Sequence, residues 1–494
     1  MRKQNRWKWV GAAAAVGLAL TACTSSASGT GGGEPASGAE SSQGGDQMGE
    51  DQTGGDQAGG NQAGAGQTGG ESLDNGEEAV PETAAGSREE QLQWYGEKLE
   101  ESQVSEDFLD SLDQFSYRTA SALLAEPGGG ENENYSPLSL YYALGMAAMG
   151  ADGETLTEME ELLGVESPEE LAEGCRTLYE NLFYTQKRQD VLMETEGEEP
   201  EEKQPSVSLA NSLWADESLS MKEDYRSLLG EDFYASSFSV DFKQDETWGQ
   251  MENWIAEHTG GVLQPQLPRD KATLLALINT LYYYGAWEKE FPAEQTAEDV
   301  FHRADGTESQ GDFMHVSLSD SRYEEGDGWK AASLGLRGDG RGDEMVFVLP
   351  DEGVSVEDLL SSPEKLGQAL DLGEEYRPVD WTVPRFAFGS SIDGNHLLES
   401  LGVTRMFTDL AEFPGISDRR LQVSKVIQET HIGLDEKGVE GAAYTALMMM
   451  ETAAPMNPET PVEMRLDRPF VYGIRSGTGG WLFLGVVRDP FAAE

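Results

Sequence analysis

Three stretches of the chain repeat apolar residues every three or four positions, which is the spacing of one face of an α-helix. The first stretch covers residues 89–124. The second, 136–150, begins with Ser-Pro and ends with glycine, and these residues are typical of a helix's first turn and of the position after its last turn. The third, 248–258, is followed by Thr-Gly-Gly. We therefore predict helices in all three stretches.

Short apolar runs elsewhere are typical of buried strands. Residues 274–284, 345–349 and 481–487 are rich in β-branched, aromatic and aliphatic side chains, which suit a strand that is covered on both faces. Helical and strand-like stretches follow one another in no repeating order, which predicts an α+β fold.

The N-terminus has the layout of a secretory signal. Four basic residues among the first eight precede a short apolar run at 10–20, which is too short to cross a bilayer. The run ends in Leu20-Thr21-Ala22-Cys23, which resembles the lipobox of bacterial lipoproteins. The resemblance implies that residues 1–22 are removed and that Cys23 carries a lipid, so that the protein is secreted and anchored at the extracellular face of the membrane.

Residues 23–88 are rich in Gly, Ser, Gln and acidic residues and nearly lack large apolar side chains. Such a segment cannot bury enough surface to offset its chain entropy. We predict a disordered linker of about 65 residues that spans roughly 45 Å on average. Residues 89–494 are then predicted to form the folded domain.

Charge and composition exclude several classes of function. The formal net charge is -57, which disfavours nucleic-acid partners and a basic membrane-binding face. The two cysteines and five histidines show no metal-ligand spacing, and no HExxH, GxSxG or P-loop motif is present. We expect no cofactor, no metal and no enzymatic activity.

Several motifs follow one another along the predicted domain. In the N-terminal part they are Ser136-Pro137-Leu138-Ser139, the turn at 150–155, and the strand at 279–288 with Asn279, Gly285 and Trp287. In the C-terminal part they are 383–386, 401–403, 413–417, 423–426, 467–470 and 482–487. These motifs and their order resemble those of the serpin family. The resemblance implies three β-sheets surrounded by about eight or nine helices, with an exposed reactive-centre loop.

The segment after Asp435 resembles the serpin hinge. The residues that carry this resemblance are Glu436, Gly438, Val439, Glu440, Gly441, Ala442 and Ala443. In inhibitory serpins a protease cleaves the loop, the severed arm enters the central sheet as a strand, and the covalently attached protease is distorted. The resemblance therefore implies a suicide inhibitor that forms a covalent complex with its target.

Alternation of side chains along the arm suits insertion into a sheet, since alternate residues of a strand share a face. One face is apolar or small, and consists of Val439, Gly441, Ala443, Thr445, Leu447 and Met449. The other face consists of Glu440, Ala442, Tyr444, Ala446 and Met448. We predict that the first face points into the protein after insertion.

The family's usual spacing from Glu436 places the cleaved bond between Thr452 and Ala453, and a shifted register places it between Met450 and Glu451. The residue before the cut, Thr452 or Met450, is uncharged in both registers, which favours elastase-like or subtilisin-like serine proteases, with cysteine proteases as a further class. The absence of Arg and Lys between Gly438 and Arg465 disfavours trypsin-like targets.

Further site residues follow from the same resemblance. Ser136, Ser139 and Asn279 are expected in the shutter beneath the opening sheet, and Trp287 in the breach above it. Gln428 replaces the family's usual shutter histidine, and its amide is able to form a substitute hydrogen-bond network. The alternative function is a non-inhibitory binding or adhesion module on the cell surface. Under both hypotheses we expect a monomer that reaches the membrane only through Cys23.

Overall fold

The computed structural model describes residues 12–22, 79–125, 131–193, 206–337, 342–439 and 460–492. The α-helices of these residues are α1 (Arg88–Glu101), α2 (Glu106–Leu124), α3 (Pro137–Ala148), α4 (Gly153–Leu163), α5 (Pro168–Met193), α6 (Glu223–Asp232), α7 (Asp245–His258), α8 (Val356–Leu360), α9 (Pro363–Leu370) and α10 (Gly394–Ser400). Two short 3-10 helices, η1 (Ala293–Gln295) and η2 (Arg405–Phe407), complete the set. The described residues thus contain ten α-helices, one or two more than the resemblance implied.

The predicted helix at 89–124 is divided into α1 and α2 by local capping. The side chain of Ser102 donates a hydrogen bond to the carbonyl of Lys98 where α1 ends. The Ser105 hydroxyl accepts one from the amide of Phe108 where α2 begins. Serine competes for helix-end hydrogen bonds in this way, so one periodic stretch became two helices.

The strands are β1 (Ala12–Ala22), β2 (Glu133–Tyr135), β3 (Ser206–Asp216), β4 (Ala235–Val240), β5 (Thr273–Trp287), β6 (Ala297–His302), β7 (Glu308–Gly326), β8 (Trp329–Arg337), β9 (Asp343–Pro350), β10 (Tyr376–Pro384), β11 (Phe386–Asp393), β12 (Leu421–Asp435), β13 (Gly438–Val439), β14 (Val462–Arg465), β15 (Phe470–Arg475) and β16 (Trp481–Val487). Hydrogen bonds join these strands into one continuous sheet. The long β7 pairs with both β10 and β8, so the expected three sheets are connected rather than separate.

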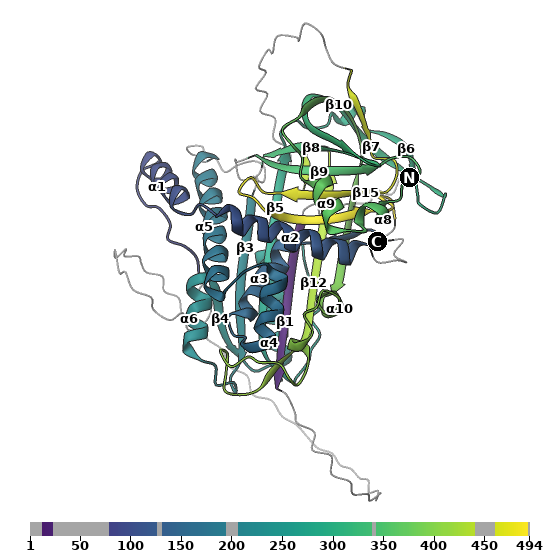
Figure 1. The fold of residues 1–494 in the computed structure, drawn as a ribbon. Coiled ribbons are helices and arrows are strands. Elements are labelled where there is room, and N and C mark those ends of the chain that lie inside the picture. Colours follow the sequence, from purple (N-terminus) through teal and green to yellow (C-terminus); the bar gives the residue numbers. More distant parts are fainter. Residues whose placement is uncertain are drawn as a thin grey trace, which may run out of the picture. The chain divides into compact units, whose positions relative to one another are not determined.

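The part of the sheet that matters for function has the strand order β4-β3-β5-β1-β12-β11. All fifteen residues of β5 are buried, which explains why its sequence is a continuous apolar run. Helix α3 is buried all round and contacts β5 and β1. Figure 1 shows the purple β1 in the middle of this region, beside β12.

Two segments that precede the predicted domain lie on the fold. Residues 12–22 form β1, inside the sheet. Ala79 is buried and its amide donates a hydrogen bond to the hydroxyl of Ser236, at 3.3 Å. The folded part therefore includes residues assigned from sequence to the signal and to the linker, because their few apolar side chains find partners on the domain. Removal of residues 1–22 and lipidation of Cys23, which lies outside the described residues, stay predictions.

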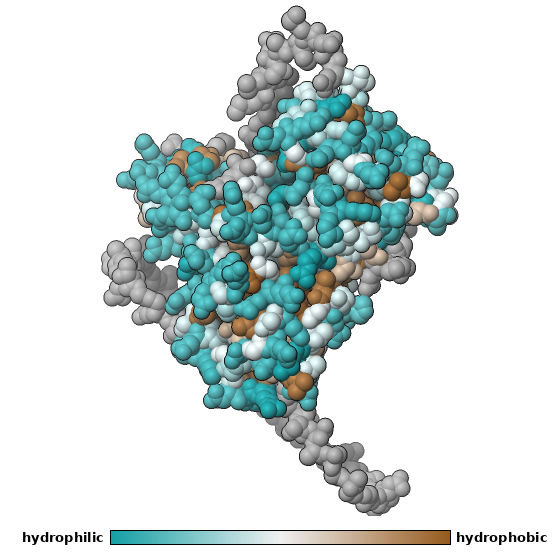
Figure 2. All heavy atoms as spheres, in the orientation of Figure 1, coloured by the Kyte–Doolittle hydropathy of each residue, from teal (hydrophilic) through white to brown (hydrophobic). Residues whose placement is uncertain are grey.

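The surface agrees with the acidic composition. On the face drawn in Figure 2, hydrophilic residues predominate and apolar residues form small separate areas. No helix in the described ranges has the length and apolar character needed to span a membrane.

Candidate functional site

The predicted hinge begins where β12 ends. Glu436 and Lys437 form a turn, after which Gly438 and Val439 enter the sheet as β13, between β12 and β5. Val439 is paired with Leu434 on one side and Gly285 on the other. Its side chain is 0% exposed. The first residues of the arm therefore already lie between the two strands, and Val439 points inward.

Glycine at 438 is required by close approach of the backbone. A Cβ at this position would lie 2.2 Å from the carbonyl oxygen of Gly285 and 2.7 Å from the Cα of Ala286. Both atoms belong to the backbone of β5, which cannot move aside without breaking its strand pairing. Gly438 thus permits the arm to enter the sheet beside β5.

Two side chains and one amide hold Glu436 in place. Its carboxylate accepts a hydrogen bond from the hydroxyl of Thr296, at 2.8 Å, and lies 3.6 Å from Nε of Arg385. The amide of Phe291 donates to its carbonyl at 2.9 Å. The turn before the arm is thereby anchored to residues outside the predicted hinge.

Trp287 lies at the same turn. Its indole N–H donates to the carbonyl of Asp435 at 2.9 Å, and its amide donates to that of Lys437 at 2.8 Å. Burial raises the pKa of the Asp435 carboxyl above its ordinary value. Trp287 therefore joins the end of β5 to the start of the arm, the place expected of a breach residue.

Below β13, the space between β5 and β12 is filled by β1. Val16 is paired with Asn279 of β5 and with Gln428 of β12. We call the space between β5 and β12, from Gly438 at one end to Ala22 at the other, the lane. Sequence reasoning missed this occupant, because a short apolar run is compatible with a signal segment as well as with a buried strand.

The four predicted shutter residues meet beneath the lane. The Ser139 hydroxyl donates to Oδ1 of Asn279, and the Ser139 amide donates to the Ser136 hydroxyl at 3.1 Å. Oε1 of Gln428 accepts from the Ser136 amide at 3.1 Å, and its Nε2 donates to the Ser136 carbonyl at 2.9 Å. Gln428 thus bonds to the backbone of Ser136 rather than to either serine hydroxyl.

Asn279 has one further partner that sequence reasoning missed. Its Nδ2 donates to Oδ1 of Asn211 on β3, at 2.8 Å, and Asn211 Nδ2 donates to the Phe233 carbonyl. Asn211 lies 68 positions away in the chain, so no local pattern pointed to it. The polar network thereby extends across β5 to the neighbouring strand.

We expect Gln428→Leu to lower the free energy of unfolding by about 1–3 kcal/mol, because the buried Ser136 amide loses its acceptor. The Ser136 carbonyl keeps a bond from the Leu140 amide. Urea denaturation measures the change. Gln310→Leu, at an exposed position of β7, is the matched control and should stay within about 0.5 kcal/mol of the unchanged protein. Equal losses in the two variants would contradict a structural role for Gln428.

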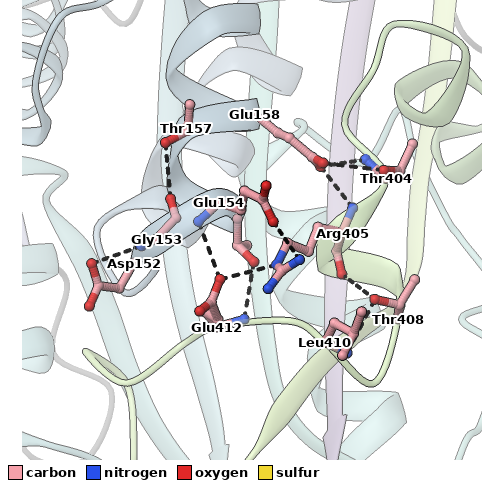
Figure 3. Close-up of polar contacts among 11 residues, drawn as sticks. Asp152, Gly153, Glu154, Thr157, Glu158, Thr404, Arg405, Thr408, Leu410 and Glu412 are labelled. Atoms are coloured by element: carbon pink, nitrogen blue, oxygen red, sulfur yellow. Dashed lines mark hydrogen bonds and ion pairs between the residues drawn. The ribbon is translucent and has the colours of Figure 1, made fainter.

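The turn at 150–155 and the chain segment 404–412 meet at the N-terminus of α4, as Figure 3 shows. The Asp152 amide donates to the Glu412 carbonyl at 3.0 Å, and the Arg405 guanidinium contacts the carboxylates of Glu154 and Glu412 at 2.7 and 3.1 Å. Glu158 accepts hydrogen bonds from the amides of Thr404 and Arg405, where η2 begins. The turn η2 contacts β12, so this network fixes the lower end of one wall of the lane.

Glycines allow these motifs to pack closely. A Cβ on Gly150 would lie 2.2 Å from Cγ1 of Ile416, and one on Gly415 would lie 2.9 Å from the Cα of Gly150. The turn at 150–155 and the segment at 413–417 are thus in direct contact, which explains why both require glycine.

Several predicted site residues lie outside the described residues. They are the hinge residues Glu440, Gly441, Ala442 and Ala443, the alternative cleavage positions Met450, Glu451, Thr452 and Ala453, and the lipidation site Cys23. Across the ranges that the structure describes, no group of three or more His, Cys, Asp or Glu side chains is arranged to hold a metal ion.

Comparison with known proteins gives consistent results. The family description "Serpin (serine protease inhibitor)" matches residues 110–490. Serpin-ZXA of Oryza sativa subsp. japonica is 32% identical over 77% of this chain and 96% of its own length. The native state of the thermophilic serpin Tengpin superposes with a TM-score of 0.64 at 26% identity, over 78% of this chain and 95% of Tengpin. Arabidopsis AtSerpin1, in its native stressed conformation, gives 0.63 at 26% identity, over 79% and 100%.

The order of the motifs, the position of the hinge between β5 and β12, and these similarities all indicate the same family. Helix α1 precedes the matched residues and packs Tyr95 and Leu99 against Tyr184 and Val191 of α5, which accounts for one helix beyond the family's usual set. Members of the family are protease inhibitors, not enzymes, and form complexes with their target proteases. The chain belongs to the serpin family.

Proposed function

We propose that this protein is a suicide inhibitor of elastase-like or subtilisin-like serine proteases, with cysteine proteases as a further target class. The observation that carries the proposal is the position of Val439. It is fully buried and is paired with both walls of the lane. An arm that begins in this way becomes a complete strand by continuing in register, once β1 has left the space between β5 and β12.

The proposed mechanism couples protease acylation to strand insertion. The protease nucleophile attacks the carbonyl of the cleaved bond, the amine on its far side leaves, and the N-terminal arm stays attached as an ester or thioester. Insertion then adds about a dozen backbone hydrogen bonds at roughly 1 kcal/mol net each, or on the order of 10 kcal/mol in total. This free energy is available to distort the attached protease before water hydrolyses the acyl bond.

The side chains of the loop support the proposed target class. Thr452 and Ala453, or Met450 and Glu451 in the alternative register, offer no basic residue to a trypsin-like pocket. Small and medium uncharged side chains fit elastase-like and subtilisin-like pockets instead.

We further propose that the mature protein is a monomer held at the extracellular face of the membrane by a lipid on Cys23. This part depends on the lipobox resemblance of residues 20–23 and on the short basic and apolar segment before it.

The test is incubation with a panel of purified proteases: an elastase, subtilisin, trypsin and a papain-like enzyme. It uses the full chain and the full chain carrying Leu18→Arg, whose buried charge disfavours β1 in the lane. We expect a detergent-resistant adduct with elastase or subtilisin for at least one of the two chains, and mass spectrometry of the released C-terminal peptide identifies the cleaved bond. Rapid loop cleavage by these enzymes without any adduct in either chain would overturn the proposal.

A further inference from the structure

Strand β1 occupies the lane along almost its whole length. Its residues pair with β5 from Tyr283 to Thr273 and with β12 from His431 to Leu421. Both ladders are antiparallel, so β1 is a central strand whose backbone groups are satisfied on both sides. Such an arrangement is a complete strand addition rather than a surface contact.

The inward side chains of β1 are part of the protein core. Val16, Leu18 and Leu20 are each 0% exposed and belong to the same apolar cluster as Val439. Helix α3 contacts β1 from this side. Burial of three aliphatic side chains stabilises β1 in the lane.

The strand β1 follows the course that the arm would take. Val439 lies opposite Gly285 and Leu434. Two residues further in register would bring Gly441 opposite Tyr283, which is the position of Ala12. Since β13 and β1 are both antiparallel to β5 and β12, they run in the same direction, and the two segments compete for the same positions.

The two segments carry side chains of similar size at the inward positions of this course. Residues 12–20 are Ala, Ala, Ala, Ala, Val, Gly, Leu, Ala and Leu, and residues 441–449 are Gly, Ala, Ala, Tyr, Thr, Ala, Leu, Met and Met. At the inward positions Val16 corresponds to Thr445, Leu18 to Leu447 and Leu20 to Met449. Val16 and Thr445 are both β-branched, Leu18 and Leu447 are identical, and Leu20 and Met449 have similar volumes, so the inward side chains of the two segments suit the same walls.

The outward face of β1 leaves space unfilled. A pocket of about 280 Å³ is lined by Ala15, Gly17 and Ala19 of β1 and by Trp248 and Met251 of α7. The corresponding outward positions of the arm carry the larger Tyr444 and Met448. Strand β1 therefore leaves space that the larger outward side chains of the arm would fill.

We infer that the segment Ala12–Ala22 is an internal competitor of the reactive arm, and that a chain which retains it is held in a weakly inhibitory state. The inference rests on the proposed function. The N-terminal segment would then have a second property beside the predicted signal. Its removal would leave the lane open to the reactive arm and so increase inhibition.

The physical basis is competition between two rates, that of strand insertion and that of acyl-bond hydrolysis. After acylation, the arm must enter the lane before water releases the protease. When β1 fills the lane, its backbone hydrogen bonds to both walls must break first, which slows insertion, and the acyl bond is hydrolysed more often. The protein is then cleaved as a substrate.

The test compares the full chain with full-length Leu18→Arg, using the protease of the panel that gives the most adduct. Arginine at this buried position disfavours β1 in the lane. Leu18→Ile is the matched control and keeps an aliphatic side chain. A second variant, Gly17→Pro, removes a strand amide without adding charge, so that misfolding of one variant does not decide the outcome. Active-site titration measures the moles of inhibitor consumed per mole of protease inactivated.

We expect Leu18→Arg and Gly17→Pro to need at least about tenfold fewer molecules per protease than the full chain and Leu18→Ile, which corresponds to about 1.4 kcal/mol in the ratio of the two rates. Hydrogen exchange of the peptides spanning β5 and β12 should rise in the same two variants. Equal titration values in all four chains, with adduct formed, would overturn the inference and leave the proposed function intact. Absence of adduct in all four would overturn both the proposed function and the inference.

Discussion

Val439→Arg, made in the Leu18→Arg chain, is expected to turn the inhibitor into a substrate. Val439 is 0% exposed and belongs to the main apolar cluster of the protein. Because Val439 is already buried between β12 and β5 before cleavage, arginine there is expected to hold this residue out of the sheet, so that insertion must first bury an unpaired charge at a cost of several kcal/mol. Insertion starts at this position, and each 1.36 kcal/mol added to its barrier slows it about tenfold. We expect the arm to insert more than about 100-fold more slowly, so that water hydrolyses the acyl bond before insertion is complete.

The measurement is the fraction of cleavage events that end in detergent-resistant adduct. Val439→Ile, which keeps a β-branched apolar side chain, should preserve most of the adduct. Lys437→Arg places the same new side chain two residues earlier, in the half-buried turn before the sheet, and should also preserve it. An undiminished adduct fraction for Val439→Arg would show that inhibition does not require residue 439 to lie inside the sheet.

Cleavage of the loop is expected to raise the melting temperature of the Leu18→Arg chain by on the order of 10 °C, since a new central strand adds on the order of 10 kcal/mol to a domain of about 400 residues. A metalloprotease suits this experiment because it forms no acyl intermediate. Scanning calorimetry before and after cleavage measures the shift. The unchanged full chain should show a smaller rise, because β1 already supplies a strand between β5 and β12.

This experiment also separates the two classes of function. The non-inhibitory binding or adhesion module predicts no increase after cleavage in any variant. The chain with both Leu18→Arg and Val439→Arg is the internal control, since its loop is cleaved but its arm is impeded. A rise of equal size in this double variant would mean that the stabilisation does not come from strand insertion at Val439.

Agreement between sequence and structure is greatest where a local pattern has one structural solution. The apolar run at 481–487 coincides with β16 (Trp481–Val487), and the run at 274–284 lies within β5. Helix α3 begins at the proline of its Ser-Pro signal. The stretch at 89–124 was predicted as one helix, which is wrong, because Ser102 and Ser105 supply side-chain hydrogen bonds that end one helix and begin the next.

The residues of the candidate site were likewise predicted only in part. The hinge sequence and the shutter residues were found through motifs, and the structure brings Ser136, Ser139, Asn279 and Gln428 together. Arg385 lies in the motif at 383–386, but no pattern in the sequence connected Arg385 or Thr296 to Glu436. Single polar residues far apart in the chain become partners only when the sheet brings their strands together.

The sequence alone determined the α+β class, the serpin resemblance and the alternation of small and apolar side chains along the arm, because each depends on neighbours within a short stretch of chain. Only the tertiary structure decided what lies between β5 and β12. The walls of that lane come from residues 273–287 and 421–435, and its occupant comes from residues 12–22. Hydrogen bonds between strands join segments without regard to their distance in sequence, so an apolar run shows by itself that it can be buried, but not where.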